Sequence, residues 1–185
     1  MGNAVEAHRS SVSCRIARVS EIMLRAVATL LSIAGALVMA KNKQDTSILI
    51  GAQELTMHAR HTYLEAFVFL VYANGIAAIY CFMSLLICCF GKRRVISALL
   101  FLFDQALAYL LLAAAACSTE ASYIAKRGES HVGWNEVCSS FKHFCDLVAV
   151  SLVLTFLSML AFGGLAIMSS KRLFGHCRAD SSASV

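Results

Sequence analysis

Residues 95–118 read VISALLFLFDQALAYLLLAAAACS, an apolar run of 24 residues that contains a single charge, Asp104. A helix needs about 20 apolar residues to cross the hydrocarbon core of a bilayer. A carboxylate inside that core costs about 2.5–3.5 kcal/mol on insertion scales, so we expect Asp104 to have a partner or a function. Within the apolar blocks of the sequence, the only basic residue is Arg25. These two residues are therefore the first candidates for a site.

The rest of the chain contains three more apolar blocks of membrane-spanning length. Apolar residues make up 59% of the 185 residues, against 45–50% in an ordinary soluble domain. Lipid cannot satisfy exposed backbone groups, so the spans must be helices, and the blocks lack the alternation of barrel strands. The sequence predicts an all-α, four-transmembrane-helix bundle that forms a single domain over residues 1–185. The helices are expected at residues 22–40, 66–90, 95–118 and 147–170, with tails at 1–21 and 171–185.

The distribution of charge between the loops gives the orientation. Segments 1–21, 91–94 and 171–185 together carry nine basic and three acidic residues, whereas loops 41–65 and 119–146 carry six basic and seven acidic ones. The positive-inside rule places the more basic side in the cytoplasm. Both termini are therefore expected to be cytoplasmic. The net charge of +5 is mostly this topology signal, and we expect no nucleic-acid partner because no soluble domain could gather the basic residues on one face.

Each predicted helix has one polar side chain near the middle of the membrane. At 1.5 Å per residue, Asp104 lies about 14 Å from the cytoplasmic start of its helix. The same arithmetic places Ser32, Asn74 and Ser158 at similar depths in a hydrocarbon core of about 30 Å. We interpret this layer as a hydrogen-bonded clasp between helices. A proton or ion path would need several ionisable groups in sequence, and Asp104 stands nearly alone.

Arg25 has two candidate partners. It lies one turn after Glu21, the favourable order for a helical acid–base pair. It would instead reach Asp104 if the first helix begins nearer Ile16, because the arginine would then lie deeper in the membrane. Spacing alone leaves both pairings open.

Small residues mark one stripe of the first predicted helix. They recur every four positions, at Ala28, Ser32, Ala36 and Ala40. Such spacing lets another helix approach closely, which is a main source of packing in lipid. We expect this stripe to be a helix interface, and we favour the interface between copies over one inside the protomer.

The cysteines fall on both sides of the membrane. Cys138 and Cys145 lie on the outer, oxidising side and are candidates for a disulfide. On a regular helix they would be about 10.5 Å apart, too far for a bond, so a bridge requires this stretch to bend. Cys88 and Cys89 lie beside the basic GKRR turn and are candidates for palmitoylation. Because the sequence offers no metal-ligand cluster, phosphate loop or catalytic constellation, we expect no metal, no cofactor and no enzymatic activity.

The chain resembles the plant Casparian-strip membrane protein-like (CASP-like) family, which is related to the MARVEL four-helix membrane proteins. The resemblance rests on the arginine of VSEIMLRAVATLLSIAGALVMA, the aspartate of LLFLFDQALAYLLLAAAA and the outer-loop stretch GWNEVCSSFKHFC. Arginine and aspartate at these positions characterise the family, which implies that Arg25 and Asp104 pair. The family's outer-loop cysteines correspond to Cys138 and Cys145, beside Trp134. The first outer loop, residues 41–65, lacks the proline- and phenylalanine-rich signature of true Casparian-strip proteins, which favours the broader CASP-like group.

The resemblance implies a plasma-membrane protein that forms homo- and hetero-oligomers with related four-helix proteins. The best-known family members organise membrane domains and recruit cell-wall-modifying enzymes. The leading interpretation is thus a non-enzymatic scaffold that orders a patch of membrane. The alternative is a small transporter or channel subunit that uses Asp104 as an ion or proton site.

Overall fold

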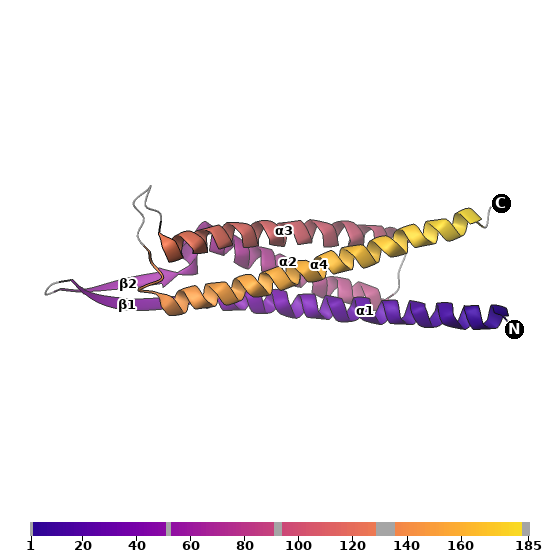
Figure 1. The fold of residues 1–185 in the computed structure, drawn as a ribbon, viewed down its shortest axis with the longest axis horizontal. Coiled ribbons are helices and arrows are strands. Elements are labelled where there is room, and N and C mark those ends of the chain that lie inside the picture. Colours follow the sequence, from indigo (N-terminus) through magenta and orange to yellow (C-terminus); the bar gives the residue numbers. More distant parts are fainter. Residues whose placement is uncertain (1, 51–52, 91–93, 129–135, 183–185) are drawn as a thin grey trace.

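The computed structural model describes the backbone of residues 2–50, 53–90, 94–128 and 136–182. It describes side chains at residues 15–47, 56–87, 96–128 and 136–171. In these parts the chain forms four long helices and one β-hairpin (Figure 1). The helices are α1 (Gly2–Ala40), α2 (Glu65–Phe90), α3 (Arg94–Arg127) and α4 (Lys142–Ser182). All four are long and apolar enough to cross a membrane, as the sequence predicts.

The four helices pack in a ring. The closely packed pairs are α1 with α2, α2 with α3, α3 with α4, and α4 with α1. Consequently α1 faces α3, and α2 faces α4, across the interior of the bundle. The core between them contains large side chains from every helix, among them Met39, Leu70, Leu111, Phe162 and Leu165.

Both termini lie at one end of the elongated bundle, and the hairpin lies at the other (Figure 1). This arrangement follows from an even number of spans. It agrees with the charge distribution, which assigns the end with the termini to the cytoplasm. We call the end with the hairpin the outer end.

The helices extend beyond the predicted limits. α1 begins at Gly2 instead of residue 22, and α4 covers Lys142–Ser182 instead of 147–170. α3 continues to Arg127, where Gly128 adopts a positive φ of 69° and its N–H donates to the carbonyl of Ile124. Glycine in this conformation is a common helix C-cap. Hydropathy reports only the part of a helix that lies in lipid, so it misses the polar turns that continue into water.

The first outer loop contains a β-hairpin that the sequence analysis did not predict. Strands β1 (Lys43–Ile50) and β2 (Gln53–Arg60) are antiparallel, and the short 3₁₀ helix η1 (His61–Tyr63) leads into α2. Across the hairpin, Asp45 pairs with His58 at 2.6 Å. That contact holds the pKa of the exposed Asp45 carboxyl below its usual range, mainly through the hydrogen bond with His58.

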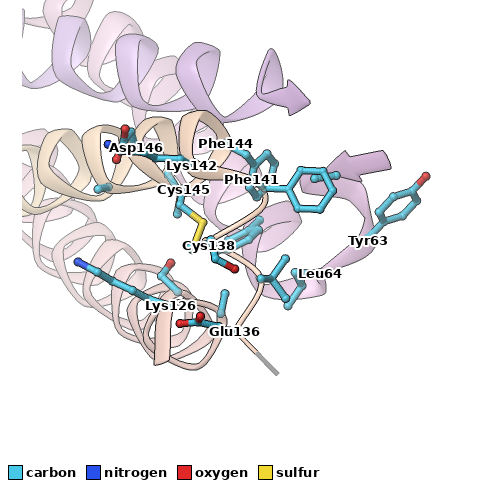
Figure 2. A pocket seen from close by; sticks show the side chains of 18 of the residues that line it. Tyr63, Leu64, Lys126, Glu136, Cys138, Phe141, Lys142, Phe144, Cys145 and Asp146 are labelled. Carbon is cyan, nitrogen blue, oxygen red and sulfur yellow. A yellow bond between two sulfur atoms is a disulfide. The ribbon is translucent and has the colours of Figure 1, made fainter. Parts of the chain in front are cut away.

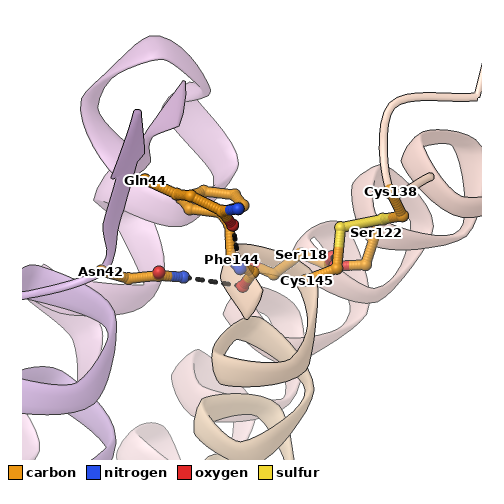
Figure 3. Close-up of a disulfide and its surroundings, with 7 residues drawn as sticks. All are labelled: Asn42, Gln44, Ser118, Ser122, Cys138, Phe144 and Cys145. Carbon is orange, nitrogen blue, oxygen red and sulfur yellow. Dashed lines mark hydrogen bonds between the residues drawn. A yellow bond between two sulfur atoms is a disulfide. The ribbon is translucent and has the colours of Figure 1, made fainter. Parts of the chain in front are cut away.

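Hydrogen bonds attach the hairpin to the outer end of α4 (Figure 3). The Phe144 amide donates to Oε1 of Gln44 at 2.8 Å, and Nδ2 of the buried Asn42 donates to the Phe144 carbonyl at 2.9 Å. A two-stranded hairpin alone is marginally stable in water. These contacts hold it over the bundle.

Candidate functional site

Arg25 and Asp104 form an ion pair in the interior of the bundle. Both side chains are completely buried. Nη2 of Arg25 lies 2.9 Å from Oδ2 of Asp104, and Nη1 lies 3.1 Å from Oδ1. Two parallel bonds of this kind are the strongest arrangement that arginine makes with a carboxylate. Arg25 comes from α1 and Asp104 from α3, so the pair joins two helices that face each other across the ring.

Three further side chains complete this cluster. Nη1 of Arg25 donates to Oγ of Ser84 at 2.9 Å, and the Tyr80 hydroxyl donates to Oδ1 of Asp104 at 2.8 Å. Glu21 lies 3.6 Å from Nε of Arg25, and its side chain is almost fully buried. Arg25 is therefore shared between both carboxylates that the sequence offers, with the shorter contacts to Asp104. We call these five residues the charge cluster.

The contact between Arg25 and Asp104 depends on the early start of α1. α1 begins at Gly2, so it is helical well before Ile22, where the apolar block starts. Asp104 lies nine residues, or about 14 Å, inside the apolar run that begins at Val95. Since the two side chains are in contact, Arg25 lies at a similar depth. Sequence reasoning missed Tyr80 and Ser84, which lie four residues apart on one helix face but carry no charge that would mark them within an apolar block.

The polar residues near the middle of the membrane make a second set of contacts. The hydroxyls of Ser32 and Ser158 lie 2.6 Å apart, joining α1 and α4. Asn74, the third residue of the predicted layer, instead donates to Oγ1 of Thr155 at 2.9 Å, joining α2 and α4. Ser151 donates to the carbonyl of Gly35 at 2.9 Å.

Two of these contacts join helices that face each other across the ring. Arg25–Asp104 joins α1 to α3, and Asn74–Thr155 joins α2 to α4. We call these two contacts the diagonal bridges. They link the pairs of helices that are not neighbours in the ring.

The stripe of small residues on α1 corrects one expectation. Ala28 and Ser32 are fully buried inside the protomer, Ala36 is half-buried and Ala40 is exposed. The stripe turns inward because Ser32 pairs with Ser158 of α4. It is therefore packed within the bundle and does not offer the lipid-facing interface between copies that we expected.

Cys138 and Cys145 are joined by a disulfide, with their Cα atoms 5.9 Å apart. α4 begins at Lys142, so Cys138 precedes the helix and the chain bends between the two cysteines. The bond closes the segment just before α4 (Figure 3). The side chains of Cys88 and Cys89 lie outside the described residues, and their palmitoylation stays a prediction. In the described residues, no group of three or more His, Cys, Asp or Glu side chains is arranged to hold a metal ion.

Two polar residues of α3 differ from all of these because they reach the outer surface of the bundle. Gln105 is half-buried and Tyr109 is 63% exposed, and neither side chain forms a hydrogen bond within the described part of the chain. Gln105 lies ten residues inside the apolar run that begins at Val95, which is about 15 Å and near the middle of the hydrocarbon core. Sequence analysis missed both residues because it searched for partners inside the bundle.

The comparisons with known proteins agree on one family. The family model for the Casparian strip membrane protein domain matches residues 15–161. The chain is 66% identical to CASP-like protein 2U3 of Pteridium aquilinum subsp. aquilinum over 159 residues, which cover 86% of this chain and 89% of that protein. It is 53% identical to CASP-like protein 2U1 of Osmunda lancea, over 83% of this chain and 90% of that protein. It is 36% identical to CASP-like protein F16 of Gossypium hirsutum, over 85% and 73%. No solved structure matches the chain.

Proposed function

The chain belongs to the Casparian strip membrane protein family, and from this premise we propose that it is a non-enzymatic scaffold of the plasma membrane. In this proposal, copies of the chain associate side by side, with each other and with related four-helix proteins, and so order a patch of membrane. The observation that carries the proposal is the pair of unsatisfied polar side chains, Gln105 and Tyr109, on the lipid-facing side of α3.

Lipid offers no hydrogen-bond partner at that depth, so an amide in the hydrocarbon core is stabilised by a polar group on another helix. The glutamine amide contains both a donor and an acceptor. It is therefore complementary to the same residue on a second copy related by a two-fold axis.

The surrounding residues have the spacing of a helix-pairing seam. Leu102, Gln105, Tyr109, Leu112 and Ala116 follow one another at intervals of three and four residues, which is the a/d pattern of paired helices. Leu102, Tyr109 and Leu112 are 59%, 63% and 42% exposed, and Ala116 is also exposed. We call this set the α3 seam. A single polar residue in such a seam fixes the register of the pair.

The transporter alternative lacks a supporting observation of this kind. Both oxygens of Asp104 already accept hydrogen bonds, Oδ1 from Arg25 and Tyr80 and Oδ2 from Arg25. A carboxylate so fully engaged serves as a fixed anchor, whereas an ion or proton carrier must exchange its partner. The geometry of the charge cluster favours a structural role.

Energy transfer between donor- and acceptor-labelled copies in liposomes, diluted stepwise with lipid, tests the proposal. Each hydrogen bond between membrane helices contributes about 1 kcal/mol. Two symmetry-related bonds therefore predict that Gln105→Leu with Tyr109→Phe separates at a lipid dilution about 30-fold lower than the wild type. The matched control is Tyr72→Phe, which removes a hydroxyl from a side chain that is 68% exposed on α2, outside the seam.

Two results would contradict the proposal. If the wild-type chain shows no specific energy transfer at any dilution, self-association itself is ruled out. If the double variant separates at the same dilution as the wild type and the control, the α3 seam is ruled out as the contact.

A further inference from the structure

A cavity of about 750 Å³ opens at the outer end of the bundle (Figure 2). It lies between β2, the start of α2, the end of α3, and the segment that leads from residue 136 into α4. Its walls are mainly apolar and include Phe67, Phe141, Phe144, Val148 and Leu152. This volume is within the range of about 300–1,000 Å³ typical of small-molecule sites.

The cavity reaches from the helix ends into the depth of the lipid. Its innermost lining residue on α4, Leu152, lies five residues beyond Leu147, where the apolar block of that helix begins. This distance is about 7.5 Å, against about 15 Å for the outward-facing half of the hydrocarbon core. The cavity therefore reaches into the outward-facing leaflet.

The mouth of the cavity is apolar as well. Tyr63, Leu64, Met57 and Val137 line it and are 65%, 42%, 43% and 47% exposed. An exposed apolar mouth at the edge of the membrane suits a molecule whose chain enters from the bilayer. It is unfavourable in contact with water alone.

Five charged residues of both signs line the cavity, namely Arg60, Lys126, Lys142, Glu136 and Asp146. In Figure 2, Lys126 and Glu136 lie on one side of the disulfide, and Lys142 and Asp146 lie on the other side. None of the five forms an ion pair with a described residue. Three cationic and two anionic side chains without mutual pairing are complementary to a ligand that carries both charges.

We propose that this cavity binds one acyl chain of a phosphatidylethanolamine-type lipid from the outward-facing leaflet. The phosphate faces Lys126 and Lys142, and the primary ammonium, which has N–H donors, faces Glu136 and Asp146. The Cys138–Cys145 disulfide lines the same cavity and holds the covering segment against α4. This site does not involve the α3 seam, so the lipid-binding proposal is tested independently of self-association.

Native mass spectrometry of the purified full chain tests the proposal. The protein is offered an equimolar mixture of dioleoylphosphatidylethanolamine, dioleoylphosphatidylglycerol and cholesterol, and the retained adducts are counted. We expect one phosphatidylethanolamine per chain to be retained in preference to the other two. Ala149→Phe, which fills the cavity, should lower its retention at least about ten-fold, since losing the burial of two methylenes alone has that effect. The matched control is Val153→Phe, one turn further along α4, where the side chain is 58% exposed and outside the cavity.

A second pair of variants tests the head group without changing the apolar walls. Lys126→Gln with Lys142→Gln should lower retention about five-fold for each lysine, while Lys41→Gln with Lys43→Gln, which also removes two outer charges, should not. Equal retention of all three lipids, or a preference for cholesterol, would overturn the assignment of the ligand. Undiminished phosphatidylethanolamine in a folded Ala149→Phe, or in the Lys126/Lys142 double variant, would overturn the site. Should Ala149→Phe fail to fold, the lysine pair decides alone.

Discussion

Arg25 is shared between two carboxylates that come from different helices, and this arrangement is asymmetric. Without Asp104, Arg25 still has Glu21 at 3.6 Å. Without Arg25, two buried carboxylates remain with no positive charge between them. Removing one partner of a buried ion pair costs about 3–5 kcal/mol, and here the loss should depend on which partner is removed.

The first prediction follows from that asymmetry. Arg25→Leu should lower the yield of folded protein and its melting temperature more than Asp104→Leu does. The double variant should lose no more folded protein than Arg25→Leu. It leaves one buried carboxylate without a positive charge beside it, whereas Arg25→Leu leaves two. Size-exclusion chromatography of a fluorescent fusion, followed by thermal unfolding, measures both quantities. Fully additive losses, or the reverse order of the single variants, would show that the charge cluster does not act as a unit.

The second prediction concerns the exposed Asp45. Its pKa lies below the usual range because His58 is hydrogen-bonded to it. A lowered carboxyl pKa means that the contact stabilises the hairpin above the ordinary pKa of aspartate. That contribution is lost as the pH falls through the lowered value. In ¹³C NMR, the Asp45 carboxyl should titrate at a higher pH in His58→Ala than in the wild type. An unchanged midpoint would rule out His58 as the cause.

At the scale of single residues, the sequence identifies charged side chains that form buried contacts better than it identifies neutral ones. Arg25 and Asp104 stand out because a charge in an apolar block is costly. Thr155, Ser84 and Tyr80 occur in similar blocks but carry no charge, so nothing in the sequence distinguishes a buried hydroxyl from an exposed one. Gln105 illustrates the same limit, since its outward direction depends on how α3 is rotated in the ring.

At the scale of the helices, α1 has a glycine, Gly35, where it packs against the Asn74–Thr155 bridge between α2 and α4. A Cβ atom on Gly35 would lie 3.3 Å from Oδ1 of Asn74 and 3.4 Å from Oγ1 of Thr155. Gly75, on α2, has no atom within 4 Å of such a Cβ. The two glycines therefore form a matched pair.

The third prediction uses that pair. Gly35→Val should push apart the Asn74–Thr155 bridge and lower the melting temperature, at a cost of about 1–3 kcal/mol typical of overpacking. Gly75→Val should leave the melting temperature nearly unchanged. Valine is a weak helix former, but glycine is a weaker one, so the helix does not lose stability. Thermal unfolding of both variants decides the point, and equal effects would contradict the assigned role of Gly35.

The helices could be predicted from the sequence, whereas the hairpin could not. A membrane-spanning helix is recognised in the sequence as an apolar block, whose length is set by the thickness of the bilayer. Strands β1 and β2 consist largely of polar residues, and their turn lacks a strong hairpin signal such as Asn-Gly. Their stability comes from tertiary contacts with Phe144, about 100 residues away in the chain. Local sequence does not contain that information.

For the molecule as a whole, the fold separates two kinds of polar contact. The charge cluster and the diagonal bridges face inward and set the shape of one bundle. In the function that we propose, the α3 seam presents polar groups to a second bundle. The first kind of contact then makes a rigid unit, and the second gives that unit a directional contact in the plane of the membrane, as a membrane scaffold requires.

The mobility of a fluorescent fusion in living cells tests this central claim most directly. After photobleaching, the wild type should recover slowly and incompletely within defined patches, because associated copies diffuse together. Gln105→Leu with Tyr109→Phe should reach the same membrane, keep its folded state and recover quickly over an even distribution. Rapid, complete recovery of the wild type, at the rate of a freely diffusing four-helix protein, would contradict the account.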